Sequence, residues 1–189
     1  MDMKGEHRIP ASRDKVWAAL NDPEVLKASI PGCETFEKTA DNAFAAKVTA
    51  KVGPVKSTFN GQVTLSDIKP PESYTISGEG KGGAAGFAKG GAKVMLRPDG
   101  EATILAYDVK ADVGGKLAQL GSRLIDGTAK KMADQFFSNF AAQVTAAPAA
   151  AAPAPAVPAA PEAPPLLKNG FVWASAAILL LLLIVLLAR

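Results

Sequence analysis

Apolar side chains recur every three or four residues in the stretch that closes the first 145 residues. Between residues 115 and 144 the gaps are 3, 4, 8, 4, 4 and 4 positions, and the polar Thr128 lies inside the gap of eight. This spacing is that of one face of an α-helix. It predicts a helix of about 30 residues, roughly 45 Å long, which must lie along an equally long surface. The apolar positions are Leu117, Leu120, Leu124, Met132, Phe136, Phe140 and Val144.

A period of two replaces this spacing between residues 34 and 111. Apolar and polar residues alternate through 44–52 and 55–65, and shorter runs follow at 73–78, 91–97 and 102–111. Gly-Pro, Lys-Pro-Pro and Pro-Asp-Gly sequences separate several of these runs, as expected for turns. In the last run, Thr103, Leu105, Tyr107 and Val109 form the better inward set, although Ile104 favours the opposite register. The pattern predicts about six antiparallel strands.

A short strand at residues 4–10 precedes two short helices. Ser12 is placed to cap a helix over residues 13–21, and Pro23 is suited to the first turn of a second helix at 24–29. The order is strand, two helices, strands and a long helix, which predicts an α+β fold. In this fold a curved antiparallel sheet is wrapped around the long C-terminal helix.

A space between sheet and helix follows from this arrangement. Several inward positions are small (Ala46, Ala50, Ser57, Gly61), so the volume beside them either collapses or holds an apolar ligand. Any one of the larger inward residues is more often core than ligand wall. The predicted ligand-binding residues are Phe44, Phe59, Tyr74, Phe87, Leu105, Tyr107, Leu117, Leu120, Leu124, Phe136 and Phe140.

The last 44 residues have a different composition. Residues 146–165 contain 7 Pro and 11 Ala, which predicts a disordered linker, taken as 146–170, after a folded domain at 1–145. Residues 171–187 are apolar and uncharged, lie between Lys168 and Arg189, and include Trp173 near one end. We expect a transmembrane tail anchor there. The expected location is the inner (cytoplasmic) membrane, with the folded domain in the cytoplasm.

Charge and reactive residues exclude several classes of function. The net charge is +3 without long basic runs, so nucleic acid is not an expected partner. The lone Cys33 excludes an internal disulfide, and the lone His7 excludes a multi-histidine metal site, so no metal is expected. We interpret Cys33 as a packing residue rather than a redox thiol, and His7 as an ordinary strand residue rather than a catalytic base.

Seven glycines lie among the fourteen residues 78–91. No Lys-Ser or Lys-Thr pair follows them, which argues against a phosphate loop. The favoured interpretation is a bend and bulge in a curved sheet. The alternative is a flexible gate at the mouth of the cavity, with Phe87 as its apolar plug.

Two groups of residues resemble a known family. The sequence VWAALNDPEVL at 16–26, followed by IPGCE at 30–34, resembles the START-like, Bet v 1-type (SRPBCC) superfamily. The stretch GGKLAQLGSRLI at 114–125 and the segment 129–140 narrow the resemblance to the G-type subunits of carbon monoxide dehydrogenase. The resemblance covers roughly residues 1–145. It implies a helix-grip fold with an apolar cavity and association with a molybdenum hydroxylase-type dehydrogenase.

The resemblance also implies a membrane recruiter that binds a quinone or lipid. We therefore expect a non-catalytic protein whose partners are the bilayer, a hydrophobic small molecule and the dehydrogenase, with a bound quinone rather than a covalent cofactor. A structural adaptor or assembly factor with a collapsed cavity is the alternative. A cyclase or hydrolase is a third, and it would need titratable groups facing inward. The inward set offers only Tyr74 and Tyr107.

Overall fold

The structure is a computed structural model that describes residues 2–146. The predicted linker beyond residue 146 and the predicted transmembrane segment at 171–187 lie outside the described residues. Among the helices formed by residues 2–146, none combines the length and hydropathy needed to cross a bilayer.

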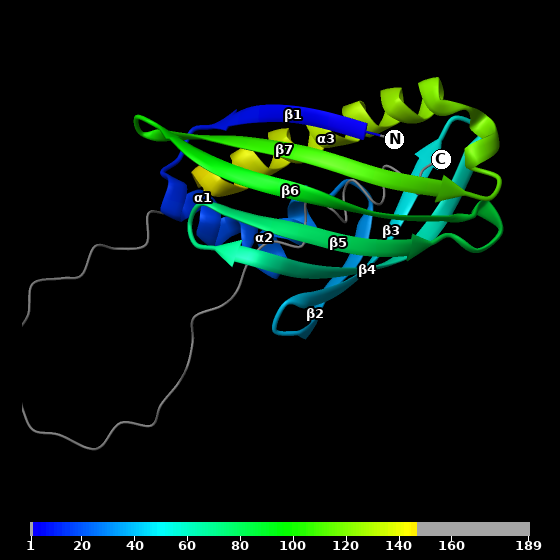
Figure 1. The fold of residues 1–189 in the computed structure, drawn as a ribbon, viewed down its shortest axis with the longest axis horizontal. Helices are drawn as coiled ribbons and strands as arrows, with labels where there is room; N and C mark the ends of the chain where they lie inside the picture. The colour runs from blue at the N-terminus through cyan, green and yellow to red at the C-terminus, as the bar shows by residue number, and fades with distance from the viewer. Residues whose placement is uncertain (1, 147–189) are drawn as a thin grey trace, which may run out of the picture.

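Within residues 2–146, a single antiparallel sheet holds all seven strands, in the order β1-β7-β6-β5-β4-β3-β2 (Figure 1). The long helix α3 runs along one face of the curved sheet, and α1 and α2 lie at one end of that face. This is the helix-grip arrangement, and it confirms the predicted α+β fold. The elements are β1 (Asp2–Ile9), α1 (Arg13–Leu20), α2 (Pro23–Ser29), β2 (Cys33–Ala40), β3 (Ala43–Val52), β4 (Val55–Lys69), β5 (Ser73–Lys81), η1 (Gly83–Ala85), β6 (Phe87–Asp99), β7 (Ala102–Gly114), η2 (Ala118–Leu120) and α3 (Ser122–Ala146).

Alternation along the strands sets which face is buried. In β3, every second residue from Phe44 to Val52 is buried, while Lys47 and Lys51 between them are exposed. In β7 the buried set contains Thr103 and Leu105, and Ile104 is only half-buried. The predicted register of this strand is therefore confirmed.

Local signals start the two short helices as expected. The Ser12 hydroxyl accepts a hydrogen bond from the Lys15 amide at 3.4 Å. The carboxylate of Asp22 accepts one from the Glu24 amide at 2.9 Å, and Pro23 occupies the first turn of α2. Both caps satisfy backbone donors that have no partner inside the helix.

The long helix begins later than the sequence pattern predicts. Residues 115–121 form a separate connector, because Gly115 and Gly121 have φ angles of +86° and +83°, which an α-helix does not allow. Leu117 and Leu120 therefore do not belong to α3, and the predicted start at residue 115 is wrong. Within α3 the buried face also differs at its first turns. It consists of Ile125, Ala129, Met132, Ala133, Phe136, Phe137, Phe140 and Val144.

The glycine-rich run lies mostly within the sheet. Gly78 on β5 pairs with Gly90 on β6, and the two strands pair without a register shift from Ser73 to Lys81. Only residues 82–86 form the turn between them. The sheet interpretation is confirmed, but the expected bulge is absent between these two strands.

Candidate ligand site between the sheet and the long helix

Large apolar side chains gather on the inner face of the sheet and on the facing side of α3. Phe136 and Phe140 lie on α3, are fully buried and stack with their ring centroids 5.6 Å apart. The predicted sheet residues are also buried and alternate with less buried neighbours, which places them on the inner face. These residues are Phe44, Phe59, Tyr74, Leu105 and Tyr107.

A strip of small residues crosses this inner face. Ala46 on β3 pairs with Gly61 on β4, Gly61 pairs with Gly80 on β5, and Gly80 pairs with Ala88 on β6. All four are buried. Four neighbouring strands therefore present nothing larger than a methyl group along one continuous line.

A second row of cross-strand neighbours on the inner face, closer to the middle of β6, contains larger side chains. Leu65, Ile76, Ala92 and Val109 are cross-strand neighbours on β4, β5, β6 and β7, and three of the four are large. All are buried. The floor of the inner face thus changes from large to small side chains over four residues of β6.

Two predicted ligand-binding residues point elsewhere. Phe87 lies on the outer face with an exposed fraction of 47%, and its ring covers the backbone of Gly114 on the paired strand. Leu124 is 41% exposed and lies beside Gly53 in the β3–β4 turn. Their predicted inward placement was wrong. Phe87 directly precedes the buried Ala88 in β6, so the two side chains face opposite sides of the sheet. The later start of α3 turns Leu124 outward.

The connector closes one end of the space between sheet and helix. Leu117 is fully buried, and its amide donates a hydrogen bond to the carbonyl of Ala85 in the β5–β6 turn at 3.1 Å. The backbones also touch, because a Cβ added at Gly115 would lie 2.5 Å from the Cα of Gly86. Leu120 is half-buried. Leu117 is therefore buried at this end, whereas Phe87 is not.

His7 faces inward on the edge strand β1. Its ring stacks on Phe137 of α3 with centroids 4.0 Å apart, and Nε2 lies 4.0 Å from a carboxylate oxygen of Asp134. Tyr107 stacks against the same Phe137 ring at 5.6 Å and lies over Gly5, which leaves no room for a side chain there. These residues join β1, β7 and α3 along one side of the sheet.

Burial changes the protonation of this cluster. It lowers the pKa of His7, and the nearby Asp134 only partly opposes that shift. Burial also raises the pKa of Tyr107, and the negative charge of Asp134 raises it further. A groove of about 310 Å³ opens beside the cluster and is bordered by Phe137 and Ser138. Sequence reasoning did not find this cluster, although alternation with the buried Ile9 would have placed His7 on the inner face.

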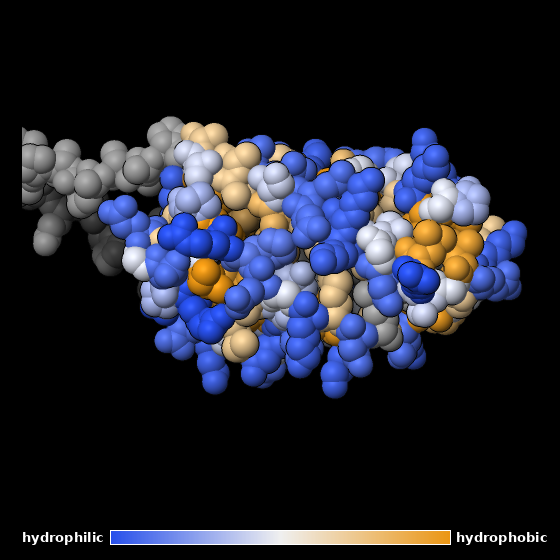
Figure 2. All heavy atoms as spheres, turned by 90° about the horizontal axis from the view of Figure 1, so that it is seen from above, coloured by the Kyte–Doolittle hydropathy of each residue, from blue (hydrophilic) through white to orange (hydrophobic). Residues whose placement is uncertain are grey.

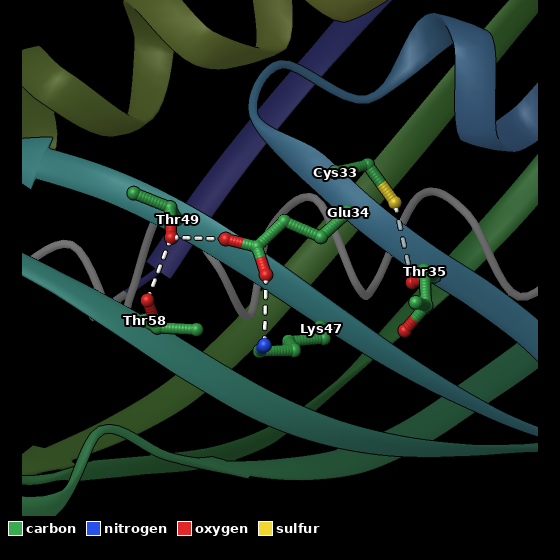
Figure 3. Close-up of polar contacts among 6 residues, drawn as sticks. All are labelled: Cys33, Glu34, Thr35, Lys47, Thr49 and Thr58. Atoms are coloured by element: carbon green, nitrogen blue, oxygen red, sulfur yellow. Dashed lines mark hydrogen bonds and ion pairs between the residues drawn. The ribbon is translucent and has the colours of Figure 1, made fainter.

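The outer face carries a polar network between β2, β3 and β4 (Figure 3). Glu34 accepts a hydrogen bond from the Thr49 hydroxyl at 2.7 Å and pairs with Lys47 at 2.9 Å. Both contacts lower the pKa of Glu34. Thr49 also bonds Thr58 on β4 at 2.7 Å. These contacts point away from the inner face, so we interpret them as ties between strands.

Cys33 begins β2 next to this network. Its thiol donates to the carbonyl of Thr35 at 3.4 Å, and burial raises its pKa to about 11. A thiol with that pKa is a poor nucleophile at neutral pH, which favours the packing interpretation. Among residues 2–146, no group of three His, Cys, Asp or Glu side chains is arranged to hold a metal ion.

Comparison with known proteins adds the family. The model of the CoxG family, the G-type subunits of carbon monoxide dehydrogenase, matches residues 5–145. The chain belongs to this family. The family match therefore covers the domain that contains the strip of small residues, the buried aromatic residues and the connector. No curated protein matches the sequence.

Solved structures resemble the domain of this CoxG family member. A conserved protein of Geobacillus kaustophilus has 30% sequence identity and a TM-score of 0.73, over 77% of this chain and 95% of that chain. A protein of Thermus thermophilus has 17% identity and a TM-score of 0.61, over 79% and 100%. An aromatase/cyclase from a Streptomyces species has 11% identity and a TM-score of 0.55, over 77% and 93%. The last two likenesses concern the fold alone.

Proposed function

We propose that this protein is a non-catalytic carrier that holds a hydrophobic ligand, a quinone, between the sheet and α3. The strip formed by Ala46, Gly61, Gly80 and Ala88 supports the proposal, because it presents nothing larger than methyl groups on a face that is otherwise lined by large apolar groups. Ligand pockets for such molecules are mainly apolar and open between packed elements. The family name implies association with carbon monoxide dehydrogenase, and we propose that this molybdenum hydroxylase-type enzyme donates its electrons to the bound quinone.

Geometry favours a carrier over a cyclase or hydrolase. A general base must lie within hydrogen-bond reach of its substrate. His7 pairs with Leu105 on β7, whereas the small strip ends at Ala88, which pairs with Val113. The two β7 positions are eight residues apart, or roughly 27 Å along the strand. The imidazole is therefore far from any group bound over the strip.

The C-terminal segment completes the proposal. We propose that residues 171–187 anchor the chain in the inner membrane and that the domain faces the cytoplasm. The Pro/Ala-rich residues before them would let the domain travel between the bilayer and the dehydrogenase. The protein would then recruit the enzyme and connect it to the quinone pool.

The test is extraction of the full-length protein, purified from its native membrane, followed by mass spectrometry. We expect a prenyl quinone in near-stoichiometric amount. In parallel, a chain lacking residues 171–189 should leave the membrane together with the dehydrogenase. A protein that contains no prenyl lipid and still captures the dehydrogenase would be an adaptor. A dehydrogenase that stays on the membrane without the tail would refute recruitment.

A further inference from the structure

Three chain connections meet at one end of the domain. They are the β3–β4 turn at residues 53–54, the β5–β6 turn at 82–86 and the connector at 115–121. Because neighbouring strands are antiparallel, these connections share one end of the sheet, at the right of Figure 1. We call it the connector end. Leu117 and its bond to Ala85 close the interior there.

The connector end is basic. The segments 51–57, 81–89 and 112–124 contain six basic residues and one acidic residue, Asp112, which pairs with Lys89 across β6 and β7. All six side chains are exposed, and one of them is paired with Glu79 just outside these segments. The basic residues are Lys51, Lys56, Lys81, Lys89, Lys116 and Arg123.

The opposite end is acidic. The turns there lie within residues 40–43, 67–73 and 98–102, and they contain five acidic residues and one lysine, Lys69. The acidic residues are Asp41, Asp67, Glu72, Asp99 and Glu101. Arg8 of β1 pairs with Asp99 at 2.7 Å, and Lys38 of β2 pairs with Asp41 at 3.6 Å, so both neutralise part of this charge. Charge is therefore separated along the length of the domain, although the net charge of the whole chain is only +3.

Exposed apolar side chains lie among the basic residues. Phe87 and Leu124 are two of the three large apolar residues that are most exposed within residues 2–146, and both lie at the connector end. Figure 2 shows hydrophobic side chains gathered at the end where α3 begins, with hydrophilic groups around them, and a smaller hydrophobic group near the other end. Apolar groups surrounded by lysine and arginine are typical of surfaces that enter the headgroup region of a membrane.

We propose that the connector end docks on an anionic bilayer surface. This inference rests on the proposed carrier function and names the part of the domain that would exchange ligand with the membrane. The basic residues face the lipid phosphates, and Phe87 and Leu124 enter the interface. The acidic end, where α3 finishes at Ala146, points away because anionic lipid repels it. The closed connector, with Leu117 behind it, then faces the bilayer.

Chain length permits this orientation. Forty-three residues follow Ala146, the last described residue. The part of the predicted linker 146–170 that follows Ala146 reaches about 75 Å when extended. The helix α3 has 25 residues and is about 38 Å long, so a tether that leaves the acidic end can still let the connector end reach the same membrane.

The test uses the full chain in lipid nanodiscs with a polarity-sensitive fluorophore at one cysteine. Cys33→Ala removes the native thiol, and Ala84→Cys places the label in the β5–β6 turn. Glu101→Cys places it in the β6–β7 turn at the acidic end as the matched position. With phosphatidylglycerol in the disc, we expect a blue shift and quenching by spin-labelled lipid at position 84 and neither at position 101. Discs of phosphatidylcholine alone should give neither signal at either position.

Charge variants decide whether the basic residues cause docking. Replacing Lys56, Lys116 and Arg123 by glutamine should lower the ratio of docked to undocked protein on the order of 100-fold. The control replaces Lys93, Lys130 and Lys131, which are exposed away from the three segments, and should change it much less.

Several results would overturn the proposal. They are equal signals at positions 84 and 101, no lipid-dependent signal at position 84, or a signal that survives the first set of charge changes. A signal at position 84 that requires the dehydrogenase instead of anionic lipid would overturn it too, and would identify a protein-docking end. Quinone content, measured on the same variants, separates failure of docking from failure of the carrier function.

Discussion

Enlarging the small strip tests whether the inner face holds a ligand. Ala88→Leu adds three carbon atoms on β6 between Gly80 and Val113. Ala92→Leu adds the same atoms on the same strand and the same face, but between Ile76 and Val109. Both alanines are at most 3% exposed. The two variants therefore differ mainly in the size of their cross-strand neighbours.

The expected magnitudes follow from these neighbours. A leucine at position 92 must displace large side chains that are already packed, and overpacking of this kind destabilises by about 1–3 kcal/mol. For a domain of this size, that lowers Tm by on the order of 3–10 °C. A leucine at position 88 enters the space that the proposal assigns to ligand. We expect it to change the stability of ligand-free protein by less than about 1 kcal/mol.

Two measurements on each variant separate the outcomes. The Tm is measured after removal of lipid by detergent exchange, so that loss of ligand does not itself lower stability. The quinone content is measured by extraction of protein taken directly from membranes. We expect Ala88→Leu to lose quinone and keep its Tm, and Ala92→Leu to lose Tm and keep quinone. Equal destabilisation of both variants with unchanged quinone would refute the reasoning, because the strip would then be packed core.

Three further predictions concern local features. Gly115→Ala should lower the free energy of unfolding by about 1–3 kcal/mol in urea titrations, because φ is +86° and the new Cβ meets Gly86. In contrast, Gly127→Ala, in an exposed and open part of α3, should raise it by up to about 1 kcal/mol. The lowered pKa of His7 means that the unfolded chain binds the proton more readily, so stability should fall as pH drops below the usual value of 6.5. Urea titrations at pH 7.5 and 5.5 should show a smaller decrease for His7→Gln, and an unchanged decrease would contradict this. Because the pKa of Cys33 is about 11, a thiol reagent at pH 8 should react much faster in urea than with native protein.

Local patterns in the sequence were sufficient to predict most of the fold. Strand alternation is unambiguous where one face is buried, as in β3, because a shift of one residue would expose Phe44 and Val48 together. The turns were equally clear, since Gly53 and Gly100 adopt positive φ values that glycine favours. The helix caps at Ser12 and Asp22 are also local interactions. These features depend on neighbours within a few residues.

The errors arose where local spacing fitted two arrangements. Leu117, Leu120 and Leu124 have helical spacing, but Gly121 breaks the helix through its backbone conformation, which apolar spacing does not reveal. In the glycine-rich run, few side chains show which residues face inward and which face outward. Phe87 was therefore placed inward. The partner of a residue on an edge strand is harder still to predict, because the stacking of His7 on Phe137 joins opposite ends of the domain sequence.

The separation of charge could be recognised only once the topology was known. Lys56, Lys81 and Lys116 are far apart in the sequence, and each lies in a segment with few charges, so no basic run is visible. Antiparallel pairing brings alternate connections to the same end and leaves the acidic turns at the other. The net charge hides this separation because the two ends nearly cancel. A uniformly distributed positive charge would attract the domain to anionic lipid in any orientation, whereas separated charge favours one orientation. The proposed carrier requires one orientation, since its ligand would pass into the bilayer from the end of the domain that faces it.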